Sequence, residues 1–148
     1  MKITGERLLN ANTATVWRMV LDPDVLEKVT PGIKKLEAIG ADSYHALSQV
    51  RVGPVKGEFK GKLTITDKVD GKSCRLVIDQ KSTMGHVVAE IDMQLNPTEE
   101  DNTHVTYTGE AKMSGMLARM GQRIMGGVVS TLSKQFFEAL EKEMENNV

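Results

Sequence analysis

The sequence has a single cysteine, few aromatic residues and no long apolar run, and these absences exclude several kinds of site. Cys74 is the single cysteine, which excludes an internal disulfide bond and a zinc site built from several cysteines. Aromatic residues make up only 4% of the 148 residues. No run of about 18 apolar residues exists, and no apolar segment follows a basic N-terminus, so neither a transmembrane helix nor a signal peptide is predicted. We therefore expect a cytoplasmic protein.

Charge and length restrict the partners and the fold. Twenty acidic and 19 basic side chains leave a net charge of −1, which argues against a nucleic-acid partner because such proteins usually carry a basic field. A chain of 148 residues can build one core without disulfides or metals, so residues 1–148 are predicted to form a single domain. Nine methionines indicate an adaptable interior, suited either to a loosely specified core or to a pocket for a pliant apolar ligand.

Patterns for catalysis, metal binding and phosphate binding are missing. His45, His86 and His104 are far apart and fall on polar strand positions or loop edges, so we expect them at the surface. The segment GPVKGEFKG begins a strand rather than a helix and matches neither phosphate-binding glycine motif. No G-x-S-x-G elbow is present. The sequence thus predicts no catalytic residue, no metal and no cofactor.

The N-terminal third predicts a short edge strand followed by two short helices. The strand is expected within Met1–Asn10. Asn12-Thr13 can cap the first helix, and Asp22-Pro23 can end it and begin a second helix that runs through Val29. A turn follows at Pro31-Gly32.

From Ile33 to Met113, apolar and polar residues alternate, which is typical of strands with one buried face. Short turns rich in glycine, proline and asparagine separate these strands, so they should pair as an antiparallel meander with one polar and one apolar face. The predicted strands are Ile33–Ile39, Tyr44–Val52, Val55–Val69, Ser73–Thr83, Val87–Leu95 and Thr103–Met113.

The C-terminal segment predicts one long helix from Ser114 to about Asn146, with a frayed tail at Glu145–Val148. Its apolar arc spans roughly 200°, wider than the stripe of an ordinary surface helix. No other predicted element is long enough to cover the apolar face of the sheet. The apolar positions at helical spacing are Leu117, Met120, Ile124, Val128, Leu132, Phe136 and Leu140, and Met125 and Val129 widen the arc.

Glycines mark two places where this helix and sheet should be irregular. Gly57, Gly61 and Gly109 occupy inward strand positions, where they either let the sheet bend or leave volume for a ligand. The pair Gly126-Gly127 falls in the middle of the helix. It is either a kink or mobile joint, which would make Ser114–Gly127 a lid, or a tolerated irregularity.

Two inward polar residues of one strand are also informative. Cys74 is expected to be a buried, inert thiol. Gln80 lies in line with Cys74, Leu76 and Ile78, either at the rim of the sheet or placed to hydrogen-bond a ligand carbonyl.

Inward glycines opposite a helix with a wide apolar arc predict a ligand cavity between sheet and helix. Apolar side chains and glycines from the strands and the first half of the helix should form it. The predicted ligand-binding residues are Phe59, Gly61, Leu63, Leu76, Ile78, Ala89, Ile91, Tyr107, Gly109, Met120, Ile124 and Val128.

Three segments together resemble the CoxG family of carbon monoxide dehydrogenase subunits, within the START/Bet v 1-like (SRPBCC) superfamily. They are TVWRMVLDPDVLEKVTPGIKKLEAIG, VRVGPVKGEFKGKLTI and SGMLARMGQRIMGGVVSTLSKQFFEALEKE. The resemblance spans nearly the whole chain. It implies the α+β helix-grip fold, a curved antiparallel sheet wrapped around a long C-terminal helix with two short helices after the first strand.

The resemblance also implies a function: an accessory protein of a molybdenum-containing hydroxylase such as carbon monoxide dehydrogenase, which binds an isoprenoid quinone or a lipid. One alternative is a docking or assembly factor without a physiological ligand, in transient contact with the inner face of the cell membrane. Another is a cyclase- or hydrolase-type enzyme on the same fold, for which Tyr44, Gln80 and Tyr107 are the inward polar candidates. Fold alone does not decide among them.

Overall fold

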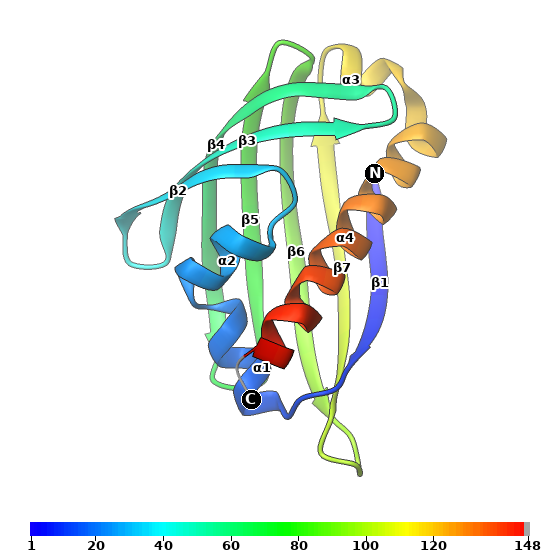
Figure 1. Ribbon diagram of the computed structural model, residues 1–148. Coiled ribbons are helices and arrows are strands. Elements are labelled where there is room, and N and C mark those ends of the chain that lie inside the picture. The colour runs from blue at the N-terminus through cyan, green and yellow to red at the C-terminus, as the bar shows by residue number, and fades with distance from the viewer. Residues whose placement is uncertain (147–148) are drawn as a thin grey trace.

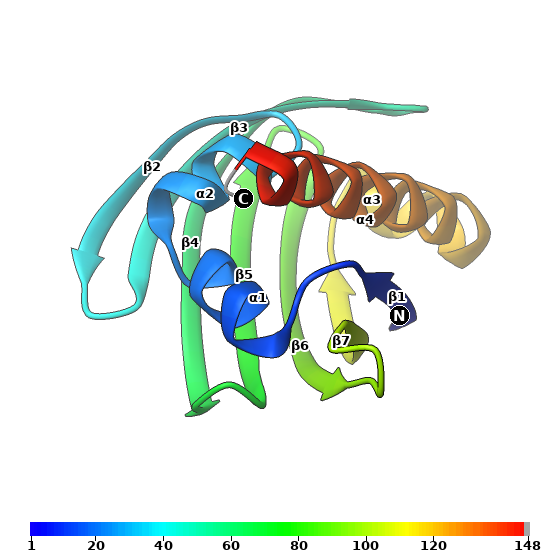
Figure 2. The same cartoon turned by 60° about the horizontal axis from the view of Figure 1, so that its bottom comes forward.

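One antiparallel sheet of seven strands, in the order β1-β7-β6-β5-β4-β3-β2, curves around the long helix α4 (Figures 1 and 2). The computed structural model describes residues 1–146. The strands are β1 (Lys2–Leu9), β2 (Ile33–Gly40), β3 (Ser43–Val52), β4 (Val55–Val69), β5 (Ser73–Ser82), β6 (Gly85–Pro97) and β7 (Thr103–Met113). The helices are α1 (Thr13–Val20), α2 (Pro23–Val29), α3 (Met116–Arg119) and α4 (Gly121–Asn146).

This architecture confirms the α+β fold predicted from the alternation of residues. Strands β2 to β7 form the expected meander, and β1 pairs with β7 at the other edge of the sheet. Helices α1 and α2 carry the chain from the β1 edge to the β2 edge, and Figure 2 shows them at one end of the space enclosed by the sheet. Helix α4 lies across the concave face of the sheet (Figure 1).

The two short helices begin where their capping residues predict. The Asn12 side chain accepts a 2.9 Å hydrogen bond from the Thr15 backbone N–H. Asp22 accepts one of the same length from the Asp24 backbone N–H, and Pro23 occupies the first turn of α2. Each cap satisfies a backbone donor that the helix itself leaves unpaired.

The long C-terminal helix differs from its prediction at its start. The chain forms the short α3, and then turns at Gly121, whose φ of +81° favours glycine. Helix α4 begins there and continues through Gly126 and Gly127. The prediction of one helix from Ser114 is therefore wrong, because the break falls at Gly121. At the other end, Glu145 and Asn146 belong to α4, while Asn147 and Val148 lie outside the described residues.

The largest apolar cluster joins α1, α2 and the C-terminal half of α4 to the sheet. Leu9, Val16 and Leu140 are completely buried in it. At its border, Arg7 of β1 donates a 2.9 Å hydrogen bond to Glu141 of α4, which raises the pKa of Arg7. This cluster fixes the C-terminal half of α4 against the rest of the fold.

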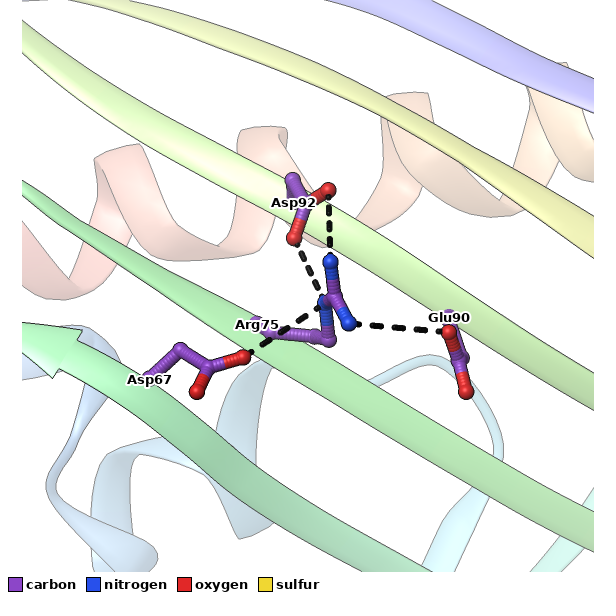
Figure 3. Close-up of polar contacts among 4 residues, drawn as sticks. All are labelled: Asp67, Arg75, Glu90 and Asp92. Atoms are coloured by element: carbon purple, nitrogen blue, oxygen red, sulfur yellow. Dashed lines mark hydrogen bonds and ion pairs between the residues drawn. The ribbon is translucent and has the colours of Figure 1, made fainter.

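A charged cluster ties three strands together on the other face of the sheet (Figure 3). Arg75 of β5 donates two hydrogen bonds to the carboxylate of Asp92 of β6, at 2.8 and 3.3 Å. Asp67, at a bulge in β4, and Glu90 lie 3.8 and 3.7 Å away. The hydrogen bonds from Arg75 lower the pKa of Asp92. Because these groups are exposed, their contribution to stability is small.

Candidate ligand-binding site

The concave face of the sheet presents rows of residues that lie opposite one another across the central strands. Residues that pair directly share a face, so each row points toward α4. One row is Tyr44, Leu63, Ile78, Ala89 and Ala111, and the next is Ile65, Leu76, Ile91, Gly109 and Ile3. A third contains Cys74, Met93, Tyr107 and Gly5.

Apolar side chains in the middle of this face are only partly buried. Leu63, Leu76, Ile78 and Ile91 belong to the central strands β4, β5 and β6, yet each keeps part of its surface accessible. Side chains at such positions are fully buried where a helix packs closely against a sheet. Helix α4 thus leaves the centre of the concave face accessible.

The interior is divided accordingly into three clusters of buried residues. The first surrounds Leu9, Val16 and Leu140, as described above. The second contains Val55, Phe59, Leu117, Met125 and Val128, at the N-terminal end of α4. The third is small and contains Ile3, Ala89 and Ala111. The partly buried residues of the central strands lie at the borders of these clusters, where a close-packed domain usually has one continuous core.

The structure places the predicted ligand-binding residues as follows. Phe59, Ala89 and Val128 are buried, whereas Leu63, Leu76, Ile78, Ile91, Tyr107 and Met120 are partly buried. Ile124 is 46% exposed, so its predicted inward position is wrong. Met125, the next residue, takes that place in the second cluster, because the rotation of α4 is set by its packing against Val55 and Phe59.

Gly61 and Gly109 allow close approach between strands. A Cβ atom at Gly61 would stand 1.8 Å from the carbonyl oxygen of Asp79 on β5. At Gly109 it would stand 2.2 Å from the carbonyl oxygen of Glu90 on β6. Gly57 has open space but a φ of +134°, which side chains disfavour. Of the two interpretations of these glycines, the structure favours bending of the sheet over volume for a ligand.

Gly126 and Gly127 are exposed on α4 and have open space around them. A Cβ at either residue would have no neighbour within 4 Å. Close packing therefore does not require glycine at either position. That Ser114–Gly127 moves as a lid stays a prediction.

Gln80 and Cys74 are the inward polar residues of β5. Cys74 is 3% exposed, and burial raises the pKa of its thiol to about 11, which confirms the expected buried thiol. The Gln80 amide oxygen is buried and has no hydrogen-bond partner. This buried oxygen distinguishes Gln80 from an ordinary rim residue, and the amide donates hydrogen bonds through Nε2 while Oε1 only accepts them.

The two inward tyrosines are held by their surroundings. Tyr44 is 6% exposed and belongs to the first cluster. The Tyr107 ring stacks on Phe137 of α4 with 5.8 Å between ring centroids and 26° between planes. Both rings contribute to packing, which sequence patterns alone did not reveal.

The histidines lie apart in the fold as well as in the sequence. His86 pairs with Asp79, and His104 lies 3.7 Å from Glu6. Across residues 1–146, no group of three or more His, Cys, Asp or Glu side chains could hold a metal ion.

Two open pockets lie outside the predicted cavity. One, of about 630 Å³, lies between the end of β1, α1 and the C-terminal end of α4. The other, of about 290 Å³, lies over β2, β3 and β4. Of the predicted ligand-binding residues, Gly61 borders the second pocket and none borders the first. The concave face is thus marked by its accessible apolar side chains rather than by either of these pockets.

Comparison with protein-family models shows the family to which the chain belongs. Residues 5–145 match the family model of CoxG, a subunit of carbon monoxide dehydrogenase. The chain belongs to the CoxG family. A comparison with curated proteins finds no match.

Two solved structures are similar to the chain over nearly its whole length. A conserved protein from Geobacillus kaustophilus is 33% identical, with 99% of this chain and 96% of that chain covered and a TM-score of 0.95. A START superfamily protein from Mycobacterium smegmatis is 10% identical, with 99% of both chains covered and a TM-score of 0.79. The second similarity shows a START-like fold for this CoxG family member. Within the part of the chain that the structure describes, no helix is long and apolar enough to cross a membrane.

Proposed function

We propose that this CoxG family member is a non-enzymatic carrier that binds a hydrophobic small molecule between the sheet and α4. The observation that carries the proposal is the partial exposure of Leu63, Leu76, Ile78 and Ile91 on central strands beneath a covering helix. Burying an exposed side chain of this size completely contributes about 1.5–3 kcal/mol, so a ligand that completes the burial of these partly buried side chains gains a fraction of that free energy at each. A START-like fold supports the same function.

The ligand we propose is a lipid or an isoprenoid quinone, and the partner is a molybdenum-containing hydroxylase. The CoxG family is named after a carbon monoxide dehydrogenase component, which supports such an enzyme complex. The packing of Tyr44 and Tyr107 argues against the enzyme alternative, because both rings are held in apolar clusters. The chain would then deliver or collect its ligand and leave the chemistry to the enzyme.

The proposal is tested by ligand binding in matched variants of the full chain. Leu76→Trp places a large side chain on the concave face, while Val77→Trp places the same side chain on the opposite face of β5. Decylubiquinone and a fluorescent fatty acid serve as probes in titration, and native mass spectrometry of the purified chain detects molecules retained from the cell. We expect the wild type and Val77→Trp to bind at least one probe and Leu76→Trp to bind about tenfold more weakly.

Two results would overturn this function. In one, the folded wild type binds neither probe and carries no small molecule in native mass spectra. In the other, Leu76→Trp and Val77→Trp bind as tightly as the wild type, which would place the ligand elsewhere. Thermal melts of each variant show that the compared chains are folded.

A second candidate function is contact with an anionic membrane surface. Met116 of α3 and Ile124 of α4 are 53% and 46% exposed, and the exposed Arg119 and Arg123 lie close to them in sequence. Apolar side chains flanked by cations are typical of segments that insert shallowly into anionic bilayers. This contact would place the chain at the inner face of the cell membrane.

Vesicle binding tests that surface. The variant Met116→Ser/Ile124→Ser should lose binding to phosphatidylglycerol-containing vesicles. Leu8→Ser is the matched control, because Leu8 is 60% exposed on β1 and lies near the C-terminal end of α4 rather than at the end that carries Ile124. Equal sedimentation of all three chains with vesicles, or of none, would rule out docking through Met116 and Ile124.

A further inference from the structure

The amide of Gln80 stands out on the concave face because its oxygen has no partner. Its Oε1 atom is buried without a hydrogen bond, among the residues that the structure describes. Buried carbonyl oxygens in folded proteins almost always accept at least one hydrogen bond, because losing water without a replacement costs free energy. An orphaned acceptor therefore indicates a donor that the chain itself does not supply.

The residues beside Gln80 explain why its oxygen lacks a partner. Gln80 lies opposite Gly61 on β4 and opposite Val87 on β6. Gly61 has no side chain, and Val87 packs against the apolar cluster of Phe59 and Leu117. Neither cross-strand neighbour can donate a side-chain hydrogen bond to the amide.

Apolar residues continue from Gln80 along the same face of β5. Ile78 and Leu76 follow at alternate positions, and both are partly buried. Alternate residues on a strand are about 6.6 Å apart, so the distance from Gln80 to Leu76 is about 13 Å. A molecule lying along this line would place one polar end at Gln80 and an apolar chain over Ile78 and Leu76.

We propose that Gln80 selects the ligand by accepting a hydrogen bond from a hydroxyl or N–H group at one end of an otherwise apolar molecule. This inference rests on the carrier function proposed above. Lipids with a free hydroxyl and hydroquinones meet the requirement. An oxidised quinone has only acceptor oxygens, so it can accept from the Gln80 Nε2–H groups but leaves Oε1 unpaired.

The test compares two probes that differ in a single donor. Farnesol has a terminal hydroxyl, and farnesyl methyl ether has the same chain without the donor. Isothermal titration should show that the wild type binds farnesol about three- to tenfold more tightly, the range expected for one hydrogen bond. Gln80→Leu should bind both probes equally, while Gln94→Leu, at an exposed glutamine on β6, should keep the preference.

The outcomes separate this inference from the carrier function. If the wild type binds both probes with equal affinity or prefers the ether, Gln80 does not act as an acceptor, although the carrier function stands. If Gln80→Leu keeps the preference for farnesol, another residue accepts the hydrogen bond from its hydroxyl group. If the wild type binds neither of these probes nor the two used above, the carrier function itself fails. If Gln80→Leu does not fold, equal binding of the two probes by the wild type still overturns the acceptor role.

Discussion

Gly5 and Tyr107 lie directly opposite each other in β1 and β7, and a Cβ atom at Gly5 would stand 2.2 Å from the Tyr107 hydroxyl oxygen. The tyrosine ring therefore lies over the glycine. The same ring stacks on Phe137 of α4, so it connects the edge of the sheet to the covering helix. Glycine at position 5 thus helps to determine how α4 rests on the sheet.

Replacement of this glycine should displace the ring. In Gly5→Ala, the new methyl group pushes Tyr107 away and weakens its stacking on Phe137, so we expect a loss of about 1–2 kcal/mol in the free energy of unfolding. Urea denaturation measures the loss, and NMR shifts of the Tyr107 ring report its movement. Gly40→Ala is the control, since a Cβ there meets nothing within 4 Å. If Gly5→Ala is as stable as the wild type, the Tyr107 ring can adopt a second position of equal free energy.

Gly61→Ala should cost more than Gly5→Ala. Its methyl group would collide with the backbone oxygen of Asp79, and a paired strand cannot move aside as a side chain can. We expect a loss of about 3 kcal/mol or more, measured by urea denaturation with Gly40→Ala as reference. If Gly61→Ala keeps wild-type stability and weakens probe binding instead, Gly61 provides ligand volume after all.

Alanine at the two glycines within α4 should stabilise the protein. Gly126 and Gly127 are exposed and unobstructed, and glycine in a helix interior is about 0.5–1 kcal/mol less favourable than alanine. Gly126→Ala/Gly127→Ala should therefore melt at a higher temperature. Gly121→Ala should melt lower, because its φ is +81°. A lower melting temperature for the double variant would show that these glycines serve a bent state of the helix.

The Cys74 thiol should make stability depend on pH in the alkaline range. Burial raises its pKa from 9.0 to about 11, so the folded chain favours the neutral thiol. This stabilising contribution is complete below pH 9 and is lost as the pH rises from 9 to 11. We expect the difference in unfolding free energy between wild type and Cys74→Ala to shrink over that interval. Subtracting the unfolding free energy of Cys74→Ala from that of the wild type cancels the contributions of the lysines and tyrosines. A difference that does not change with pH would contradict the buried thiol.

Local patterns were sufficient to predict most of the fold. The predicted β4 and β7 strands, Val55–Val69 and Thr103–Met113, have the bounds that the structure shows. Alternation is a property of neighbouring residues, and so is the cap of Asn12 on Thr15. The resemblance of three segments to the CoxG family agreed with the family match over residues 5–145.

The sequence by itself determined the alternating strands, their turns, the capped helices and the inward direction of Leu76, Ile78 and Gln80. Tertiary structure decided that Met125 rather than Ile124 faces the interior, because adjacent helical residues differ by about 100° and packing on Phe59 selects between them. It also decided the meaning of Gly61, since the Asp79 carbonyl that crowds it belongs to another strand. The unpaired oxygen of Gln80 is likewise set by residues distant in sequence, because hydrogen-bond satisfaction depends on which groups the folded chain brings together.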